Sequence, residues 1–317
     1  MSNPEPPPPS PSSILRGYLE LVRLPNIFTA MADVMMGFLF THAVFLPGED
    51  GWVLGLLLAA SSLLYAAGVV LNDVCDFEVD CVERPGRPLP SGRVSRTAAR
   101  WLGWELLIVG VALAWLAGFL ANDFRPGIVA LVLAGCVVGY DRWLKRTPAG
   151  PLGMGGCRML NVLLGMSLLI GSWQAAHWLI AASVGIYIAG VTWFARNESG
   201  TSSRRQLGLA MVVVLLGVGL LAWLPDWTGR LFDVRHTTPD RFRLAIGVLG
   251  LLIGFRFLRA VMEPGPYRVQ MAVKQGILSL VVLNAAVCFL AQGLFGAAAV
   301  LVLLIPAVVF GRWIYST

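Results

Sequence analysis

Long apolar runs repeat along almost the whole of this 317-residue chain and constrain its fold more than any other feature. An α-helix needs about 20 predominantly apolar residues to cross a lipid bilayer. Only 13% of the residues are charged, which is roughly half the share found in soluble domains. This composition excludes an ordinary soluble enzyme, a disordered chain and a soluble nucleic-acid-binding protein. We expect an all-α, polytopic membrane bundle of nine to ten transmembrane helices.

The apolar runs mark the expected spans. They cover roughly residues 24–46, 52–71, 97–121, 127–141, 152–172, 176–195, 207–224, 242–260, 271–291 and 294–315, the last two joined by the tight turn Ala291-Gln292-Gly293. Residues 1–13 are rich in proline and lack an apolar core, so they predict a disordered tail and not a signal peptide. We expect residues 14–317 to form one transmembrane domain.

Basic residues collect on one side of these spans, as in the cytoplasmic loops of membrane proteins. If the N-terminus is cytoplasmic, most of the 24 Lys and Arg residues fall in cytoplasmic segments. The opposite side holds Arg125, Arg230, Arg235, Arg241 and Arg243. We therefore expect a multi-pass protein of the cell's inner or plasma membrane. Its N-terminus and the polar loops 72–96, 141–158 and 196–206 would all face the cytoplasm.

An acidic cluster follows the second apolar run, in a chain with only 18 Asp and Glu residues. Asp73, Asp76 and Asp80 stand at i, i+3 and i+7, so on one continuous helix they share an arc of about 60°. Like charges at this spacing repel each other unless water or a cation relieves the repulsion. Mg²⁺ suits this role because it binds one or two carboxylates together with substrate phosphates. The plainer alternative is an acidic helix end in water.

A loop stiffened by proline and glycine follows the carboxylates and carries Arg84, Arg87 and Arg93. The planar guanidinium of arginine can donate two hydrogen bonds to one phosphate group. Carboxylates for a metal, followed by arginines for phosphate oxygens, predict a site for a Mg²⁺-bound diphosphate.

The acidic cluster and the arginine loop together resemble the UbiA superfamily of intramembrane prenyltransferases. The resemblance rests on N-D-x-x-D-x-x-x-D at residues 72–80, R-P-L-P-S-G-R at 87–93, Tyr140, Lys145 and Arg146 after the fourth run, and Asn161 in the fifth. It implies a helical bundle around a lipid-open cavity, in which two acidic motifs hold two Mg²⁺ ions. The ions bind the diphosphate of a polyprenyl donor and help it leave, and an aromatic or other lipid-soluble acceptor takes the prenyl group.

The resemblance also implies a role for each predicted site residue. Asp73 and Asp76 are the catalytic carboxylates and, with Asp80, the ligands of the first Mg²⁺. The residues expected to bind substrate are Asn72, Arg84, Arg87, Lys145, Arg146, Arg158 and Asn161. For Arg158 and Asn161, a positive-inside anchor and an interhelical hydrogen bond are the structural alternatives.

The second acidic motif has fewer carboxylates than the family pattern, which carries D-x-x-x-D after the sixth run. Between residues 192 and 204, Glu198 is the only carboxylate. Asn197 and Glu198 are therefore the expected ligands of a weakened second metal site, because fewer charges bind Mg²⁺ less tightly. Together with the Gly155–Asn161 segment, this stretch resembles a divergent branch of the superfamily.

Two other functions compete with a prenyltransferase. The small number of carboxylates in the second motif is also consistent with a non-catalytic isoprenoid-binding or lipid-transport protein that keeps the fold. An ion-coupled transporter needs several charges inside the spans, and only Asp33 and Glu105 offer them. We predict a Mg²⁺-dependent membrane prenyltransferase whose partners are a prenyl diphosphate, a lipid-soluble acceptor and membrane lipids.

Overall fold

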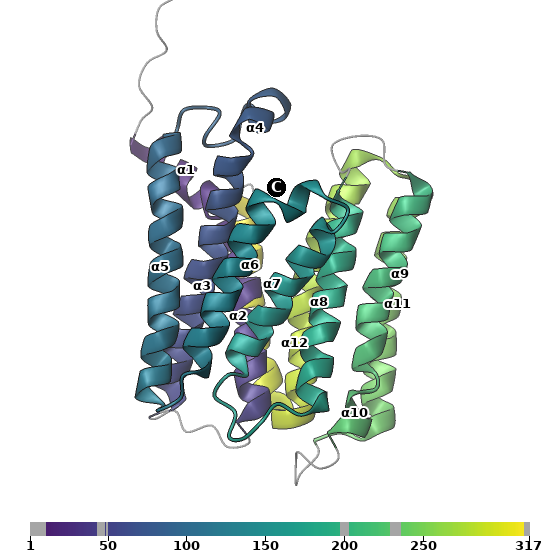
Figure 1. The fold of residues 1–317 in the computed structure, drawn as a ribbon. Helices are drawn as coiled ribbons and strands as arrows, with labels where there is room; N and C mark the ends of the chain where they lie inside the picture. Colours follow the sequence, from purple (N-terminus) through teal and green to yellow (C-terminus); the bar gives the residue numbers. More distant parts are fainter. Residues whose placement is uncertain (1–10, 43–47, 49, 197–202, 229–235, 314–317) are drawn as a thin grey trace, which may run out of the picture.

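The computed structural model describes residues 11–42, 48, 50–196, 203–228 and 236–313, and every regular element in these ranges is a helix (Figure 1). The elements are α1 (Pro11–Leu21), α2 (Leu24–Thr41), α3 (Asp50–Cys75), α4 (Phe77–Glu83), α5 (Arg96–Leu120), α6 (Arg125–Arg142), the 3₁₀ turn η1 (Leu144–Arg146), α7 (Gly150–Gly165), α8 (Ala175–Ala195), α9 (Arg204–Leu221), α10 (Leu224–Trp227), α11 (Pro239–Met262), α12 (Pro266–Leu301) and α13 (Leu304–Trp313).

The helices are those of an integral, multi-pass membrane protein. In the described ranges, seven helical stretches are long and apolar enough to cross a bilayer. Their outer faces carry exposed large apolar side chains such as Ile108, Leu116, Leu251 and Phe255. A soluble protein rarely exposes apolar patches of this extent, whereas lipid tails cover them without cost. The all-helical prediction is therefore confirmed.

Each predicted apolar run coincides with a helical segment, although the number of crossings stays a prediction. The helices α6 and α7 lie within the bundle (Figure 1) but fall outside the group of seven. Two predicted boundaries were wrong. The fifth run was expected to reach residue 172, but α7 ends at Gly165, where Ser167 Oγ donates to the carbonyl of Leu164 and the chain turns. At the other end, α1 begins at Pro11, inside the expected tail.

The chain reverses direction at Gly293, as the predicted tight turn requires. Gly293 has φ 64° and ψ −149°, a conformation that strains any residue with a Cβ. After the reversal, the Nζ of Lys274 lies 3.5 Å from the carbonyl oxygen of Gly311. The ring of Phe310 stacks on Phe28 of α2, with centroids 5.9 Å apart. The last segment thus runs back along α12 and packs against α2.

The helix α2 occupies the centre of the bundle, in contact with α3, α7, α12 and α13. Small residues let α2 and α7 approach closely, as is usual between membrane helices. A Cβ on Gly37 would lie 2.6 Å from the carbonyl oxygen of Val162, and one on Gly165 would overlap the backbone of Val34. This close approach brings polar side chains of the two helices together in the interior.

Candidate active site

A polar cavity of about 680 Å³ lies at the end of the bundle that carries α4 and η1 (Figure 1). Oxygen donors and cations from distant parts of the chain line it. Its lining includes Arg23, Asn72, Asp76, Asp80, Glu83, Arg84, Arg87, Tyr140, Lys145, Arg146, Thr192 and Arg196. The structure therefore brings together seven of the predicted site residues, namely Asn72, Asp76, Asp80, Arg84, Arg87, Lys145 and Arg146.

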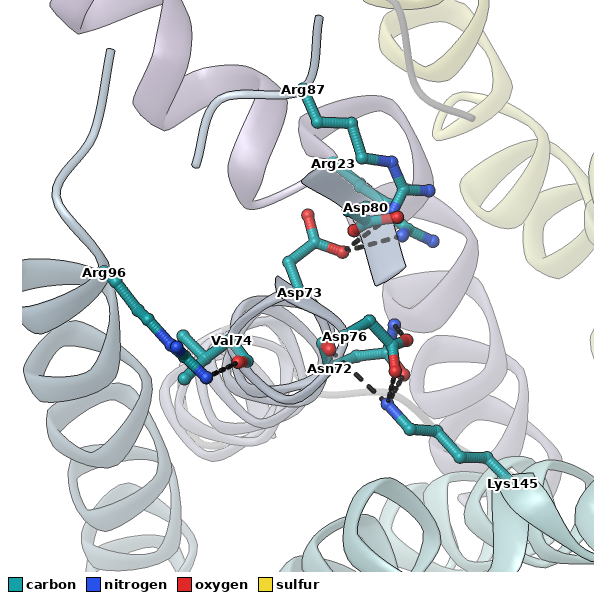
Figure 2. A network of polar contacts seen from close by, with 9 residues as sticks. All are labelled: Arg23, Asn72, Asp73, Val74, Asp76, Asp80, Arg87, Arg96 and Lys145. Atoms are coloured by element: carbon teal, nitrogen blue, oxygen red, sulfur yellow. Dashed lines mark hydrogen bonds and ion pairs between the residues drawn. The ribbon is translucent and has the colours of Figure 1, made fainter. Parts of the chain in front are cut away.

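The acidic motif crosses the junction between α3 and α4. Asp76 is the single residue between the two helices, with φ −94° and ψ 4°, and its backbone N–H still donates to the carbonyl of Asn72 at 2.9 Å. The expected single stripe of three carboxylates divides here, so that Asp73 and Asp80 lie together and Asp76 lies apart from them beside Asn72. Figure 2 shows Asp73 and Asp80 turned toward Arg23 and Arg87, and Asp76 turned with Asn72 toward Lys145.

Asp73 and Asp80 are each 5% exposed and are neutralised by arginines. Arg87 lies 2.7 Å from Asp80 and 3.4 Å from Asp73, and Arg23 lies 3.1 Å from Asp73. Arg23 has φ 48° and ψ 52° at the start of α2, a left-handed conformation that is uncommon for a residue with a Cβ. The repulsion within the acidic motif is thus relieved by the protein's own cations.

The loop that carries Arg87 is held in place by polar contacts and by buried apolar side chains. Arg93 donates to the carbonyl oxygen of Gly86 at 2.8 Å, and its guanidinium lies 2.6 Å from Glu20 of α1. Leu89 and Val94 of the loop are buried in a small apolar cluster with Leu21 of α1. The predicted proline-stiffened loop is therefore held against the bundle, with Arg84 and Arg87 at the cavity.

Asp76 is the most accessible of the three aspartates of the motif, with 29% of its side chain exposed. The Nζ of Lys145 lies 2.7 Å from its carboxylate and donates to Asn72 Oδ1 at 3.1 Å. Asn72 in turn donates to Asp76 at 3.2 Å. Lys145 belongs to η1, seventy-three residues from Asn72. One lysine therefore connects the acidic motif to the basic loop after α6.

The donor set fits a Mg²⁺ ion that shares its coordination shell with a phosphate. Asp76, Asp80 and the amide oxygen of Asn72 line one cavity, and Mg²⁺ commonly takes one or two carboxylates plus phosphate oxygens. Across the described part of the chain, no group of three or more His, Cys, Asp or Glu residues is arranged so that it could hold a metal ion by itself. Asp76, Asp80 and Asn72 are thus the residues that could offer oxygen atoms to such an ion.

The predicted second metal site, Asn197 and Glu198, lies outside the described residues. The end of α8 that leads to them is described and reaches the polar cavity through Thr192, Ala195 and Arg196. Arg196 also donates to the carbonyl of Thr147 at 2.8 Å. The segment before the second motif thus borders the same cavity as the first motif.

A second space, which we call the apolar chamber, has a volume of about 180 Å³. Leu64, Val69, Leu133, Val137 and Met154 supply apolar walls, and Ser61, Tyr65, Cys157, Arg158 and Asn161 also line it. Arg23, Asn72 and Tyr140 line both the apolar chamber and the polar cavity. The two spaces are therefore neighbours that share part of a wall.

Arg158 and Asn161 belong to a buried network between four helices. Arg158 lies 2.6 Å from Asp33 and donates to Thr29 at 2.8 Å. Asn161 donates to the carbonyl of Ala30 at 2.9 Å and accepts from Ser61 at 2.7 Å. For Asn161, these contacts match the structural alternative of an interhelical hydrogen bond. Arg158 is buried in an ion pair, unlike the positive-inside anchor that was its alternative, and its phosphate contact stays a prediction.

Two residues of the site were not predicted from the sequence. No role is assigned to Arg23 from the sequence, although its guanidinium lies 3.1 Å from Asp73 and the residue lines both cavities. Asp141, next to the predicted Tyr140, lines the apolar chamber and is 3% exposed. In the sequence, only its position in the basic loop region could have pointed to Asp141. An acidic residue in such a loop is usually an ordinary surface charge.

Known proteins share both the sequence pattern and the fold. A model of the UbiA prenyltransferase family matches residues 30–232. Digeranylgeranylglyceryl phosphate synthase of Saccharolobus solfataricus is 33% identical over 170 residues, which make up 52% of this chain and 55% of the relative. The chain spans about half the length of the curated relatives it matches.

Two solved structures share the helical arrangement. One, described as giving insight into digeranylgeranylglyceryl phosphate synthase in membranes, covers 89% of this chain and 99% of its own, with a TM-score of 0.64 and 22% identity. The other is a UbiA homologue from Archaeoglobus fulgidus bound to GPP and Mg²⁺. It covers 85% of this chain and 99% of its own, with a TM-score of 0.51 and 16% identity. At these identities the likeness establishes a common fold.

Proposed function

Because the chain belongs to the UbiA prenyltransferase family, we propose that it transfers a prenyl group from a Mg²⁺-bound prenyl diphosphate to a lipid-soluble acceptor. One observation carries the proposal. Oxygen donors and cations gather in the polar cavity, and this cavity shares a wall with the apolar chamber. A prenyl diphosphate has the same two-part chemistry, with a charged head and an apolar chain. The Archaeoglobus fulgidus homologue, solved with GPP and Mg²⁺, adds support.

The carboxylates of the polar cavity would hold the metal. Asp76 and Asp80 would each offer an oxygen to Mg²⁺, with Asn72 beside them and phosphate oxygens completing the shell. Bound there, the ion would neutralise charge on the diphosphate and so favour its departure. Direct ligation by Asp73 remains a prediction. In the structure its carboxylate holds the guanidinium groups of Arg23 and Arg87 in place.

The cations of the polar cavity would bind the phosphate oxygens. Lys145 lies next to Asp76, and Arg84, Arg87 and Arg146 line the same space. These groups place positive charge where negative charge accumulates on the leaving diphosphate, which is how preorganised cations lower a barrier. The apolar chamber would take the reactive end of the prenyl chain together with the acceptor and exclude bulk water from them.

The polar cavity would open to the cytoplasm. The loops around it, between α3 and α5 and between α6 and α7, carry Arg84, Arg87, Arg93, Lys145 and Arg146. Short loops rich in Lys and Arg are retained on the cytoplasmic side. A prenyl diphosphate in the cytoplasm would then reach the site directly.

The test is Mg²⁺-dependent turnover by the purified full-length chain in lipid nanodiscs. We would supply labelled geranylgeranyl diphosphate with two acceptors, geranylgeranylglyceryl phosphate and 4-hydroxybenzoate, and measure diphosphate release and lipid product by mass spectrometry. Asp76→Asn should lower turnover at least about 10²-fold, because it removes a charge from the metal site. The matched control is Asp226→Asn. Asp226 pairs with Arg243 at 2.6 Å and lies on α10, at the opposite end of the bundle (Figure 1).

Two results would contradict the proposal. Full turnover by Asp76→Asn would remove the metal site from the mechanism. Binding of geranylgeranyl diphosphate by the wild type without any diphosphate release, whatever acceptor is supplied, would instead favour the non-catalytic isoprenoid-binding protein.

A further inference from the structure

A carboxylate outside the polar cavity connects α1 to the loop between α4 and α5, at the end of the bundle that carries the site (Figure 1). The side chain of Glu20 is 10% exposed and lies against two arginines. Its Oε1 is 2.9 Å from the Nε of Arg16, and its Oε2 is 2.6 Å from the guanidinium of Arg93 in the loop. The described residues that line the polar cavity do not include Glu20 or Arg93. Their ion pair therefore acts from outside the cavity.

The guanidinium of Arg93 closes the loop on itself. Besides the contact with Glu20, its Nη2 donates to the carbonyl oxygen of Gly86 at 2.8 Å, and its Nε donates to the hydroxyl of Ser91 at 3.1 Å. Each of its three nitrogens thus has a different partner. Gly86 stands between the two arginines of the loop that line the polar cavity. The hydrogen bond to Gly86 therefore fixes the backbone that carries both of them.

The helix α1 offers this loop a closely fitting surface. A Cβ on Gly17 would lie 3.2 Å from Val94 and 3.3 Å from the Cβ of Arg93, so the missing side chain lets the loop approach the helix. Leu21, one turn further along α1, is 0% exposed and packs with Leu89 and Val94. The ion pair beside these contacts is shielded from water, with its two side chains 10% and 22% exposed. It is therefore stronger than a fully solvated pair.

The other contacts that hold the loop are made at the site itself. Arg87 pairs with Asp73 and Asp80 of the acidic motif. In the proposed function, a metal ion and a diphosphate compete for these charges, so the ion pairs of Arg87 weaken when the donor binds. The contacts of Arg93 lie outside the cavity and persist. A loop that keeps its shape binds with a smaller loss of entropy, because its groups are already ordered.

We propose that Glu20 is a positioning residue of the donor site. Through Arg93, it holds the loop of Arg84 and Arg87 in the shape that binds the diphosphate of a prenyl donor. This inference rests on the proposed prenyl transfer. It gives α1, which precedes the first predicted span, a part in substrate binding. It also separates Arg93, which shapes the loop, from the two arginines of the same loop that face the cavity.

The variant Glu20→Gln tests this role, because the amide keeps the size of the side chain and removes its charge. We would measure the Kd for geranylgeranyl diphosphate with Mg²⁺ by isothermal titration calorimetry, using the full-length protein in nanodiscs. We expect Kd to rise about 10-fold, the effect of having to order one or two long side chains on binding. The KM for the donor should rise by the same factor, while kcat and the KM for the acceptor change less than about 2-fold.

The matched control is Arg16→Gln, which removes the other partner of Glu20. The side chain of Arg16 is 61% exposed and belongs to α1 itself, so Kd and KM should keep their wild-type values. A second test variant, Arg93→Lys, keeps a charge opposite Glu20 but lacks the planar guanidinium that reaches three partners. It should raise Kd as much as Glu20→Gln does. Combining these two changes should add little further loss, because both interrupt the same connection.

Hydrogen exchange of the loop tests the inference without any substrate. The backbone N–H groups of Arg87, Ser91, Gly92 and Val94 donate to carbonyl oxygens within the loop. In Glu20→Gln these amides should exchange about 10-fold faster than in the wild type, because the loop opens more often. The same amides in Arg16→Gln should exchange at the wild-type rate.

Several results would overturn the inference. A wild-type Kd in Glu20→Gln would do so, and if its Tm were lowered as well, Glu20 would serve folding alone. Unchanged exchange of the loop, or an equal rise of Kd in Arg16→Gln, would do so too. If the wild type binds geranylgeranyl diphosphate but never releases diphosphate, the proposed function fails. The Kd and exchange comparisons would still decide the role of Glu20.

Discussion

Asp33 and Arg158 form an ion pair at 2.6 Å in the interior of the bundle, with the two residues 0% and 7% exposed. Asn161 and Asn284 complete the hydrogen bonding of the carboxylate at 3.3 and 2.8 Å. Charges at this depth persist only when they are paired. The sequence identified Asp33 as a charge inside a span and Arg158 as a candidate substrate-binding residue. Their pairing could not be predicted, because 125 residues separate them and only the packing of α2 on α7 joins them.

Removing one partner of this pair should destabilise the fold. Asp33→Asn leaves the guanidinium of Arg158 buried without its counter-ion, which costs about 3–5 kcal/mol in comparable buried pairs. We expect a clear fall in Tm for detergent-solubilised protein, measured by thermal unfolding. The double variant Asp33→Asn with Arg158→Gln should lose less, because it leaves no unpaired charge. Equal losses in the single and double variants would show that the pair is not coupled.

At the scale of the elements, the helices could be predicted and their ends could not. Uninterrupted apolar runs indicated where helices lie because a bilayer allows few other structures. The early end of α7 depends on local contacts, such as the hydrogen bond from Trp173 to the carbonyl of Met166 at 3.1 Å. The division of the acidic motif at Asp76 depends on which cation faces each carboxylate. Such contacts are set by tertiary packing, which hydropathy does not report.

The contact between α2 and α7 offers a test of packing. Gly165→Ala would place a methyl group against the backbone of Val34, with no flexible side chain to yield. Overpacking of this kind costs about 1–3 kcal/mol, so we expect a lower Tm. Gly135→Ala on α6 is the matched control, because nothing lies within 4 Å of its added Cβ. It should leave Tm unchanged or raise it slightly, since alanine favours the helix. A Tm for Gly165→Ala equal to that of the control would contradict the close approach.

At the scale of the whole molecule, the sequence identified the polar motifs but not how the fold brings them together. The motif around Asp73 and Asp76 and the basic loop of Lys145 were both identified. Local patterns alone could not predict that they meet in one cavity, or that Tyr140 joins this cavity to an apolar chamber. Both facts depend on how α3, α6 and α7 pack, and thus on contacts between residues far apart in the chain.

Metal removal should affect activity without affecting the fold. Asp73 and Asp80 are already neutralised by Arg23 and Arg87, so we expect the fold to be stable without a bound ion. We expect EDTA to abolish prenyl transfer while leaving the Tm of the protein without donor unchanged. The check is a thermal melt of the same nanodisc sample with EDTA and with added Mg²⁺. A large fall in Tm on chelation would indicate a structural ion and contradict this account.

The pairing of every carboxylate in the acidic motif with a lysine or arginine gives the polar cavity the character of an ion exchanger. A cation that binds Asp76 would release Lys145 from its ion pair, and an arriving anion would pair with the released lysine. Each incoming charge would thus replace an internal counter-ion, so the metal and the anion would gain most by binding together. Without ligands, the charged groups of the site are held in ion pairs within the protein. Binding of the metal and the diphosphate would replace these with ion pairs to the ligands.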